Sequence, residues 1–590
     1  MWQDRFEHLE GGEGSVEGQI TGAATDRGSR QKAYGHGIDG PGPIGPDGID
    51  VGRLLAWGAL GAAVVASAIL ILGLNSQLTF IADDWELLVA RDGLSVATVF
   101  EPFHENIVVG PALVYKVLQG TFGMSSAMPF YVVSISLFLA SAVLLFAYLR
   151  SRAGDWLALL AAVLILFLGA AFEDLLWAFQ LGYFASAAAG LGMLLALDQE
   201  DERGDWVACG LLVVSIAFSS LGIVFLVGAI ADLILGRQPR LRRLFVVLLP
   251  AALFAFWWLV WGHDAESHLS GENVTGLLGY VYDAAAAGVV SLLGLATNDG
   301  TSPDQAHLVW GKIIVPLVAA LVAFRIWRDS GISRGLAIAL GMALAFWVLA
   351  GLNRSDERFP TSSRYQYPSA LFLLLVMGES LRGLRLPRPA LALATVGVVL
   401  AVVSGMSLME REQDERWRPA AEAIRSSLAA VELAGPSADP AFPVTFAPNP
   451  TVSAARYLDA ARDFGSPAYS EAELGQRPEL ERAGADLTMA QALGLSLAAP
   501  QSADAHCQRL KATASGDTGI TLLGGGFTIA NQGSARVEVM LRRFARGDFS
   551  VSLGPLDPGV KTALVIPPDL AKRPWSLGLE GRGPMRLCTT

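Results

Sequence analysis

The sequence predicts a polytopic α-helical membrane protein with about eleven spans, followed by an extracytoplasmic α+β domain that ends in a small β-sandwich. The first observation is composition. Of 590 residues, 52% are hydrophobic and only 17% are charged, whereas a soluble enzyme carries about a quarter charged residues. The second is order along the chain, because long apolar segments recur up to residue 407 and stop after Met409. The net charge of −12 argues against nucleic acid as a partner, since phosphate binding takes a surplus of Lys and Arg.

Residues 1–52 are rich in Gly, Asp and Glu and hold almost no aliphatic run, which predicts a disordered cytoplasmic tail. The next block, residues 54–74, begins too far into the chain and is too long for a cleavable signal peptide, so we expect an uncleaved anchor. It opens a transmembrane domain over residues 53–409. Further apolar segments follow at residues 126–148, 156–171, 178–196, 206–218, 221–235, 244–262, 308–326, 335–352, 367–381 and 389–407.

One ambiguity decides the topology: residues 206–235 form either one long helix or two short helices that break at Ser219 and Ser220. With the break, the arginine clusters of the loops fall on the same side as the N-terminal tail, as the positive-inside rule requires. These clusters are Arg150 and Arg152; Arg237, Arg240, Arg242 and Arg243; Arg325, Arg328 and Arg334; and Arg382, Arg385 and Arg388. We therefore predict the break, and a multi-pass plasma-membrane protein with a cytoplasmic N-terminus and an extracytoplasmic C-terminal domain.

After Met409 the composition becomes that of a water-soluble protein. Residues 410–510 are predicted to be an extracytoplasmic helical segment, led by a charged helix over residues 410–434. Residues 511–590 are predicted to be a β-sandwich, because short alternating runs are bounded there by Gly and Pro. The predicted strands are residues 520–523, 527–530, 535–544, 549–553, 562–566, 575–579 and 585–588.

The cysteines are too few for a cluster of four thiolates around a metal. Cys507 and Cys588 flank the predicted sandwich, where a disulfide between them is permitted outside the cytoplasm. The alternative is two unpaired thiols. Cys209 lies within a predicted span.

The loop after the first span holds two adjacent carboxylates, Asp83 and Asp84, among aromatic residues, and a second polar group at His104 and Glu105. Paired carboxylates can serve as a general base or as oxygen ligands for Mg²⁺, Mn²⁺ or Ca²⁺. The alternative is that Asp83 and Asp84 cap a helix or are solvated loop residues.

The next loop on the same side is very short and contains Glu173 and Asp174. Charged groups at membrane depth are costly, so two acids wedged between spans predict a wet cavity and a functional role. The alternative is an interfacial position that ends the spans at the lipid headgroups.

The loop over residues 353–368 carries three arginines, Arg354, Arg358 and Arg364, on the side where the positive-inside rule disfavours them. A guanidinium suits a phosphate or pyrophosphate, and the neighbouring Tyr365 can donate a hydroxyl hydrogen bond. Local pairing with Asp356 and Glu357 is the alternative for Arg354 and Arg358, but it leaves Arg364 unexplained.

The loop over residues 263–307 contains acids but no Lys or Arg, and an amphipathic stretch at residues 274–295. This stretch is either a lid on the membrane surface or a packed helix.

This layout resembles the GT-C superfamily of polyprenyl-phosphate-dependent glycosyltransferases. The features that carry the resemblance are Asp83 and Asp84 in the first outer loop, Glu173 and Asp174 in the second, the many spans over residues 54–407, a later Arg/Tyr loop and an extracytoplasmic C-terminal domain. No donor-specific signature accompanies them, so the sugar and the acceptor stay open.

The resemblance implies a membrane glycosyltransferase that moves a sugar, with inversion, from a polyprenyl-phosphate donor to a cell-envelope acceptor. Asp83 or Asp84 would be the general base, and Arg364 would stabilise the phosphate leaving group. Glu173 and Asp174, together with Asp83, would form a candidate metal set. His104 and Glu105 would bind the acceptor or a metal. Mg²⁺, Mn²⁺ or Ca²⁺ are the metals that hard oxygen ligands imply, and metal-free catalysis is the alternative.

The expected partners are a lipid-linked sugar donor, membrane lipids, and an envelope glycan, lipid or protein as acceptor. Two other classes of function compete with the enzyme. A transporter or flippase for a lipid-linked or anionic substrate would need ionisable residues deep in the spans, where Asp232, Lys312 and Glu379 are the candidates. A non-catalytic envelope assembly protein would tolerate loss of Asp83 and Asp84.

Overall fold

The computed structural model describes residues 51–589 apart from residues 92, 237–239, 266–267, 297–304, 355–358, 385, 446–450, 500–504 and 547–548. The predicted tail, residues 1–52, thus lies almost wholly outside the described residues. The chain divides into two compact units, Met1–Leu54 and Leu55–Thr590, and the contacts described below lie within the second.

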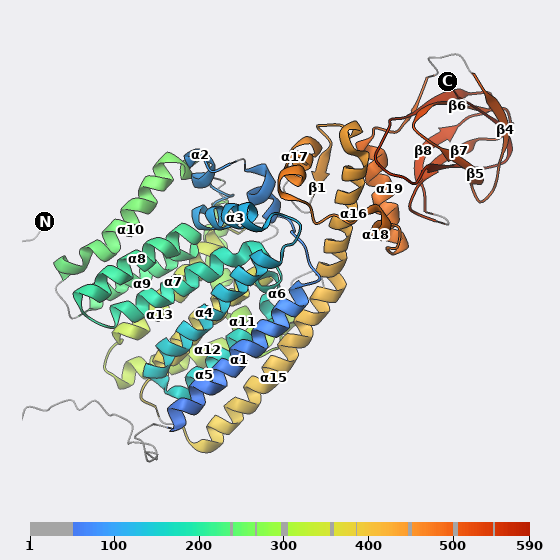
Figure 1. Cartoon of the computed structure of the whole chain (residues 1–590). Coiled ribbons are helices and arrows are strands. Elements are labelled where there is room, and N and C mark those ends of the chain that lie inside the picture. The colour runs from blue at the N-terminus through green and yellow to red at the C-terminus, as the bar shows by residue number, and fades with distance from the viewer. Residues whose placement is uncertain are drawn as a thin grey trace, which may run out of the picture. The chain divides into compact units, whose positions relative to one another are not determined.

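Long helices pack side by side over the first two thirds of the chain, and α7, α8 and α9 lie next to one another in Figure 1. Short helical turns connect them at the loops. The long helices are α1 (Val51–Asn75), α4 (Met128–Ala153), α5 (Asp155–Leu166), α7 (Leu181–Leu197), α8 (Glu202–Phe218), α9 (Leu221–Leu235), α10 (Arg240–Val260), α11 (Gly271–Leu292), α12 (Gln305–Arg328), α13 (Arg334–Leu352), α14 (Gln366–Ser380) and α15 (Arg388–Glu412). The short ones are η1 (Glu86–Ala90), α2 (Val96–Phe100), α3 (Val109–Phe122), η2 (Gly169–Ala171), α6 (Phe172–Leu175), η3 (Ala178–Gln180), η4 (Gly262–Asp264) and η5 (Ser363–Tyr365).

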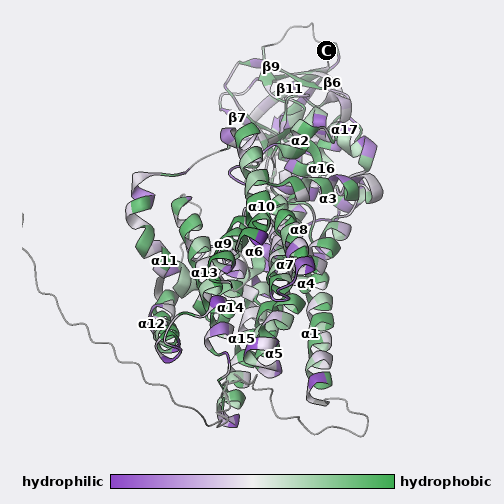
Figure 2. Ribbon diagram, turned by 90° about the vertical axis from the view of Figure 1, so that its left-hand side faces the viewer, coloured by the Kyte–Doolittle hydropathy of each residue, from purple (hydrophilic) through white to green (hydrophobic). Residues whose placement is uncertain are grey.

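Within the described residues, nine helices are long and apolar enough to cross a membrane, and Figure 2 shows hydrophobic residues along bundle helices such as α10 and α13. The predicted multi-pass helical class is therefore confirmed. All nine except α11 coincide with predicted spans. The other predicted spans are α8, α9 and α14, with 17, 15 and 15 residues. Because α14 is almost entirely buried in protein, the thickness of the lipid does not set its length.

The predicted break within residues 206–235 is present, since α8 ends at Phe218 and α9 begins at Leu221. Arg243 pairs with Asp205 near the start of α8 (2.8 Å) and with Asp232 near the end of α9 (3.1 Å). The two helices are therefore antiparallel. A Cβ on Gly222 would overlap the backbone of Ile216, so this tight turn depends on glycine.

Helix α11 is the predicted amphipathic stretch, and it is packed rather than laid over the surface as a lid. Near its start, Asn273 donates to the carbonyl oxygens of Leu352 (3.1 Å) and Arg354 (3.0 Å). Near its end, the hydroxyl of Ser291 donates to Gln366 (2.9 Å). One end thus contacts the end of α13 and the loop after it, and the other contacts the first residue of α14. Both contacts lie at the same end of α13 and α14, so α11 does not carry the chain across the bundle.

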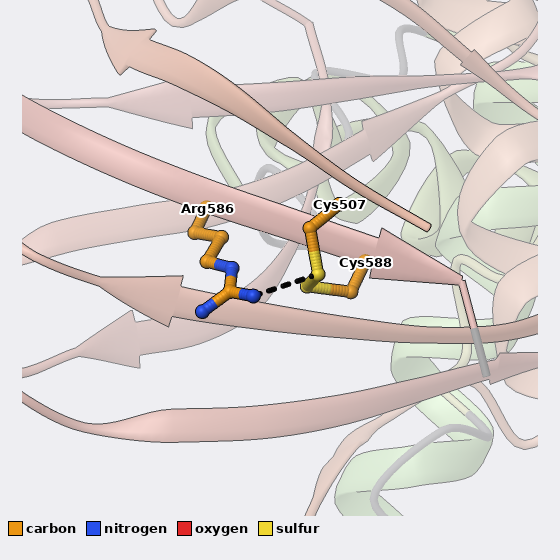
Figure 3. The surroundings of a disulfide bond; sticks show 3 residues. All are labelled: Cys507, Arg586 and Cys588. Atoms are coloured by element: carbon orange, nitrogen blue, oxygen red, sulfur yellow. Dashed lines mark hydrogen bonds between the residues drawn. A yellow bond between two sulfur atoms is a disulfide. The ribbon is translucent and has the colours of Figure 1, made fainter. Parts of the chain in front are cut away.

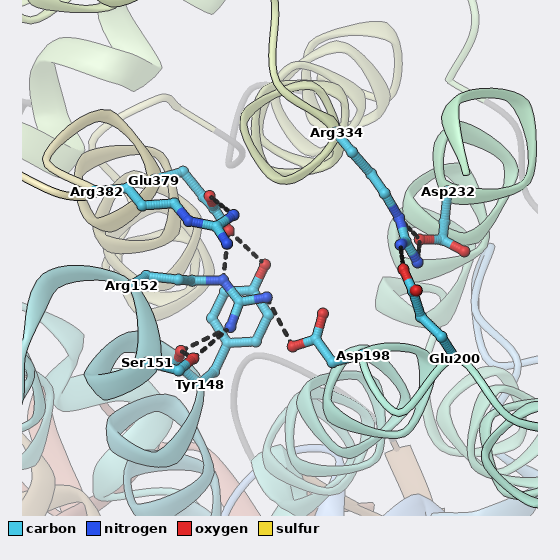
Figure 4. Close-up of polar contacts among 9 residues, drawn as sticks. All are labelled: Tyr148, Ser151, Arg152, Asp198, Glu200, Asp232, Arg334, Glu379 and Arg382. Carbon is cyan, nitrogen blue, oxygen red and sulfur yellow. Dashed lines mark hydrogen bonds and ion pairs between the residues drawn. The ribbon is translucent and has the colours of Figure 1, made fainter. Parts of the chain in front are cut away.

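Ion pairs tie several helices together at one end of the bundle (Figure 4). Arg152 at the end of α4 pairs with Asp198 (2.7 Å) and with the fully buried Glu379 (2.5 Å). Arg334 at the start of α13 pairs with Asp232 near the end of α9. We call this the arginine-rich end. It brings together members of the predicted arginine clusters, as the predicted topology requires.

The C-terminal part begins as a continuation of the bundle, because α15 runs on through the π-helical turn η6 (Gln413–Trp417) into α16 (Arg418–Ala434), as Figure 1 shows. A small hairpin and three further helices follow. In α19, the buried carboxylate of Asp486 accepts hydrogen bonds from the backbone N–H groups of Arg543 (2.8 Å) and Phe544 (2.9 Å), which joins α19 to the strands. These elements are β1 (Pro443–Thr445), β2 (Thr451–Ser453), α17 (Ala454–Phe464), α18 (Glu471–Leu474) and α19 (Glu479–Ala492).

The predicted β-sandwich is present and consists of a four-stranded sheet, ordered β5-β10-β7-β8, and a five-stranded sheet, ordered β3-β9-β6-β11-β4. Every predicted strand is found, and β3 and β4 are additional. In β7 the burial alternates, so Val537, Val539 and Leu541 point into the core. The strands are β3 (Leu497–Ala498), β4 (Cys507–Ala512), β5 (Asp517–Leu522), β6 (Gly525–Asn531), β7 (Val537–Arg542), β8 (Val551–Leu556), β9 (Lys561–Ile566), β10 (Trp575–Glu580) and β11 (Gly583–Thr589).

Cys507 and Cys588 form a disulfide, which is the pairing that the sequence favours. The two residues lie directly opposite each other in the antiparallel pair β4–β11. Arg586 donates to the sulfur of Cys507 at 3.1 Å (Figure 3). The disulfide therefore fixes an edge strand of the five-stranded sheet to its neighbour.

Replacing Cys507 with Ser is expected to lower the free energy of unfolding of the sandwich by about 4 kcal/mol. The reason is that the bond closes a loop with a sequence separation of 81, which restricts the unfolded chain. Hydrogen exchange of strands β4 and β11 in the reconstituted protein measures the effect, with Cys209→Ser in α8 as the control. Equal protection in wild type and Cys507→Ser would contradict the expectation.

Candidate active site

A cavity opens at the end of the bundle opposite the arginine-rich end, and four stretches distant in sequence line it. These are loop one (residues 76–127), loop two (residues 167–180) with the start of α7 that follows it, the turn between α8 and α9, and the loop between α13 and α14. The cavity holds about 660 Å³ of empty space, part of it open to solvent. Its polar lining residues are Asp83, His104, Glu105, Asn106, Gln180, Tyr183, Ser219, Arg364 and Tyr365.

A strained turn directly precedes the two adjacent acids of loop one. Ala82 has a left-handed backbone with φ of 47°, which is unfavourable for a residue with a side chain and occurs where the surrounding structure enforces it. The indole of Trp177 in loop two donates to the carbonyl oxygen of Ile81 (3.1 Å). Loops one and two are therefore tied together beside Asp83 and Asp84.

Asp84 points into the protein and not into the cavity, which is a correction to its predicted role as an alternative base. Its carboxylate is fully buried and accepts hydrogen bonds from the backbone N–H of Ile81 (2.8 Å) and the hydroxyl of Tyr115. Burial raises the pKa of Asp84 to about 7, although these hydrogen bonds act in the opposite direction. Asp84 thus holds the turn, and the catalytic candidate of the pair is Asp83.

Asp83 lines the cavity and is partly accessible. Burial raises the pKa of this carboxyl to about 6, against the lowering influence of His104 and Arg364. A carboxyl with a pKa near neutrality is suited to take up a proton from a hydroxyl group and release it later. Asp83 therefore has the accessibility and the raised pKa that a general base would need.

His104 and Glu105 lie at the tip of a tight turn in loop one, where Phe103 and Asn106 exchange backbone hydrogen bonds of 3.0 and 2.9 Å. His104 has a φ of 49°. The buried Arg91 holds this turn by donating to the carbonyl oxygen of Pro102 (2.9 Å). Both predicted residues, His104 and Glu105, consequently face the cavity.

Arg364 faces the same cavity and pairs with Glu173 of loop two. Its guanidinium donates to Glu173 Oε1 (2.7 Å), and its backbone N–H donates to Glu173 Oε2 (3.1 Å). Burial alone would lower the pKa of Arg364, but the Glu173 carboxylate outweighs it and keeps the pKa above its ordinary value. Arg364 is therefore a permanent cation held in a fixed direction, and it lines the same cavity as Asp83.

Asp174, unlike its neighbour, does not reach the cavity. Its side chain is fully buried, and it is absent from the cavity lining. Among the described residues, no group of three or more His, Cys, Asp or Glu side chains is arranged to hold a metal ion. The predicted metal set of Asp83, Glu173 and Asp174 is therefore not assembled, because Glu173 serves Arg364 and Asp174 faces the interior. We derive no step through a metal.

The other predicted arginines are not part of the described cavity. Arg354 pairs with Glu272 (3.4 Å) and lies beside Gly276 of α11, so it belongs to the packing of that helix. Arg358 lies outside the described residues. Tyr365, by contrast, lines the cavity next to Arg364 as predicted.

Sequence reasoning missed the contribution of Tyr183 and of an aromatic wall. Trp177 and Phe179 lie with ring centroids 5.6 Å apart, and Phe103 packs on Phe179 at 5.4 Å. These rings line one side of the cavity. A tyrosine within an apolar segment directly after a polar loop is the signal that points to Tyr183. The break at Ser219 also contributes, since it brings that residue to the cavity wall.

Fold and site together define a multi-pass helical membrane protein with a carboxyl–guanidinium cavity at one end of its bundle. No protein-family model matches the chain, and no curated protein matches its sequence. Solved structures similar to it include ArnT from Cupriavidus metallidurans bound to undecaprenyl phosphate. The identity to ArnT is 13%, with 70% of this chain and 86% of that chain covered and a TM-score of 0.45.

The archaeal oligosaccharyltransferase AglB from Archaeoglobus fulgidus, in complex with an inhibitory peptide and a dolichol-phosphate, is also similar. Its identity is 11%, with 71% of this chain and 64% of that chain covered and a TM-score of 0.41. The chain thus spans less than two thirds of the length of AglB. At these identities and scores, the similarity assigns no activity to this chain.

Proposed function

We propose that the protein is an inverting membrane glycosyltransferase that takes a sugar from a polyprenyl-phosphate donor at the extracytoplasmic face of the plasma membrane. The single observation that carries the proposal is the placement of Asp83 and Arg364 in one cavity. The resemblance of the loop layout to the GT-C superfamily supports it. The positive-inside rule puts the arginine-rich end in the cytoplasm and hence the cavity outside.

In the proposed reaction, Asp83 accepts the proton of an acceptor hydroxyl as its oxygen attacks the anomeric carbon of the sugar. The bond between that carbon and the phosphate oxygen breaks, and its electron pair stays on the lipid phosphate. The Arg364 guanidinium stabilises this developing anion. Attack opposite to the departing phosphate inverts the anomeric configuration. Asp83 then returns its proton to water.

An apolar cavity between four helices of the bundle offers a place for the lipid chain. Helices α11, α12, α13 and α14 line it with hydrophobic side chains alone, and it has about 760 Å³ of empty space, part of it open to the surroundings. At its edge, Phe346 neighbours Trp347 of this cavity and packs against Tyr365 of the active-site cavity, with ring centroids 6.2 Å apart. A chain that lies there would bring its phosphate towards Arg364.

The ionisable residues that a transporter would use are all paired. Asp232 pairs with Arg243 (3.1 Å), Lys312 with Asp283 (2.8 Å), and Glu379 with Arg152 (2.5 Å). Paired charges between helices stabilise one arrangement of the bundle, whereas a transporter needs charged groups that are released in turn. This observation favours the enzyme over a transporter.

The test is sugar transfer by membrane vesicles that contain the protein, supplied with a radiolabelled polyprenyl-phosphate sugar and candidate envelope acceptors. Wild type is expected to form labelled product, and Asp83→Asn and Arg364→Ala are expected to form much less. Full transfer by both variants would remove the catalytic assignment and leave the envelope assembly role. Transfer by control vesicles without the protein would show that another enzyme is responsible.

The rate of transfer is expected to rise with pH through a midpoint near 6. Below that pH the Asp83 carboxyl, whose pKa burial raises to about 6, is protonated and cannot accept a proton from the acceptor. The rate should therefore fall about tenfold for each pH unit below the midpoint, since one ionisation controls it. Initial rates between pH 4.5 and 8 at saturating donor measure this, and a rate independent of pH would contradict it.

A further inference from the structure

Loop one is tied at several points to the two helices that follow the bundle, α16 and α17. Arg425 of α16 donates to the carbonyl oxygen of Leu78 (2.9 Å), which lies three residues after the end of α1 at Asn75. Arg456 of α17 donates to the carbonyl oxygen of Ala90 (3.4 Å). These two contacts bracket the strained turn that carries Asp83. We call α16 and α17 together the clamp.

The exit of loop one is held by the clamp as well. The backbone N–H of Met124 donates to the carbonyl oxygen of Phe464 at the end of α17 (2.7 Å). Gly123 and Gly465 both have left-handed backbones, with φ of 71° and 79°. A Cβ on Gly123 would overlap the Phe464 carbonyl oxygen, and one on Gly465 would overlap the hydroxyl of Ser125. The two backbones therefore meet with no space between them.

An aromatic contact joins the clamp to the residue directly after the acid pair. Trp85 is fully buried, and the edge of its ring meets Tyr457 of α17, with centroids 6.0 Å apart. The hydroxyl of Tyr457 is itself fixed by Glu432 of α16 (2.6 Å) and Ser466 (2.7 Å). Tyr457 thus transmits the position of α16 to the turn that holds Asp83 and Asp84.

We propose that the clamp is a positioning element of the active site, with Arg425 and Tyr457 as positioning residues for Asp83. The turn has an unfavourable backbone at Ala82, and such a conformation persists only where several contacts enforce it. Loop one supplies some of these contacts through Asp84 and Tyr115, loop two supplies one through Trp177, and the clamp supplies others. The C-terminal part of the chain therefore helps to hold Asp83 in position through α16 and α17, in addition to any role of its own.

The experiment compares Arg425→Ala and Tyr457→Leu with wild type, in full-length protein reconstituted in lipid nanodiscs. Arg462→Ala is the matched control, because Arg462 is an exposed arginine of α17 whose ion pair among the described residues is with Asp459 of the same helix (3.0 Å). Three quantities are measured: hydrogen exchange of residues 77–91, kcat and donor KM for transfer, and the pH midpoint of kcat. The kinetic readouts rest on the proposed function, whereas hydrogen exchange does not.

Both variants are expected to exchange residues 77–91 faster and to lower kcat by about tenfold or more, since small misplacements of a reacting group are costly. Donor KM should change little, because Arg364 and the apolar cavity are untouched. The pH midpoint should fall below 6, because a loosened turn exposes Asp83 to water and its raised pKa depends on burial. The control should match wild type in all three.

Unchanged exchange of residues 77–91 in both variants would overturn the clamp, whether or not the protein transfers sugar. Lower kcat with an unchanged pH midpoint would also overturn it, because a general loss of folded protein reduces the rate without altering the ionisation of Asp83. If one variant fails to fold, the other decides. Faster exchange of residues 77–91 in the variants, together with a wild type that transfers no sugar, would retain the clamp and reject the proposed function.

Discussion

Asp83→Asn is expected to lower kcat for sugar transfer by about 10²–10⁴-fold, which is the usual contribution of a general base. The amide has nearly the shape of the carboxylate but cannot take the proton of the acceptor hydroxyl. Donor binding should persist, because Arg364 is already held by Glu173 (2.7 Å) and does not depend on Asp83. Initial rates at saturating donor and acceptor, together with a donor-binding isotherm, measure the two effects separately.

Asp84→Asn is the informative comparison, because the neighbouring acid has a different task. Its two carboxylate oxygens accept from the Ile81 N–H and the Tyr115 hydroxyl, and an amide can serve only one of these donors as an acceptor. One buried polar group left without a partner costs about 1–3 kcal/mol. The expected result is a lower melting temperature with a smaller loss of kcat, whereas Asp83→Asn leaves the melting temperature unchanged.

Glu101→Gln is the matched control within loop one, since Glu101 is an exposed acid there. It should transfer sugar at close to the wild-type rate. If Asp83→Asn retained full kcat while Asp84→Asn lost it, the assignment of roles within the pair would be wrong.

The sequence was sufficient to predict the architecture because each part has a strong physical signature. Long apolar segments predict membrane helices, and short runs of alternating apolar and polar residues bounded by Gly and Pro predict strands. The break after Phe218 was predictable from the arginines alone, because only an antiparallel pair puts the arginines around Arg243 beside those around Arg152. Helix α11 was not resolved into lid or packed helix, since an amphipathic face fits lipid and protein equally well.

The candidate site was predicted in part, and the errors have a common cause. The sequence places Asp83 and Asp84, or Glu173 and Asp174, side by side, but adjacent side chains in a turn point in different directions. Which acid of a pair faces the cavity depends on contacts with distant residues, such as Tyr115 for Asp84 and Arg364 for Glu173. Sequence spacing does not encode those contacts.

The arginines of the loop between α13 and α14 show the same limit. Arg354 and Arg364 are both candidates for an anion site in the sequence, with local pairing as the alternative for Arg354. Asn273 of α11 draws the start of the loop towards that helix by bonding the Arg354 carbonyl oxygen (3.0 Å). The end of the loop is instead fixed on loop two, where Ser363 donates to the carbonyl oxygen of Ala170 (2.7 Å). Of the two described arginines, Arg364 is the one that reaches the cavity, because it follows Ser363, which is bonded to loop two.

Arg364→Ala is expected to lower kcat by about 10²–10³-fold, because it removes the positive charge that meets the departing phosphate. The guanidinium is well prepared for this task, since Glu173 fixes its direction and keeps it charged. Arg364→Lys should recover part of the rate, as an ammonium retains the charge but not the planar arrangement of donors. Single-turnover rates with a labelled donor measure the loss at the chemical step.

Arg364→Ala also leaves the Glu173 carboxylate without its partner beside the cavity, and that negative charge would itself repel a phosphate. The double variant Arg364→Ala with Glu173→Gln removes this complication. If the missing guanidinium is the cause, the double variant should stay at the low rate of Arg364→Ala. If the uncompensated carboxylate is the cause, the double variant should recover towards wild type, and Arg364 would then be a structural partner of Glu173 and not the group that stabilises the leaving phosphate.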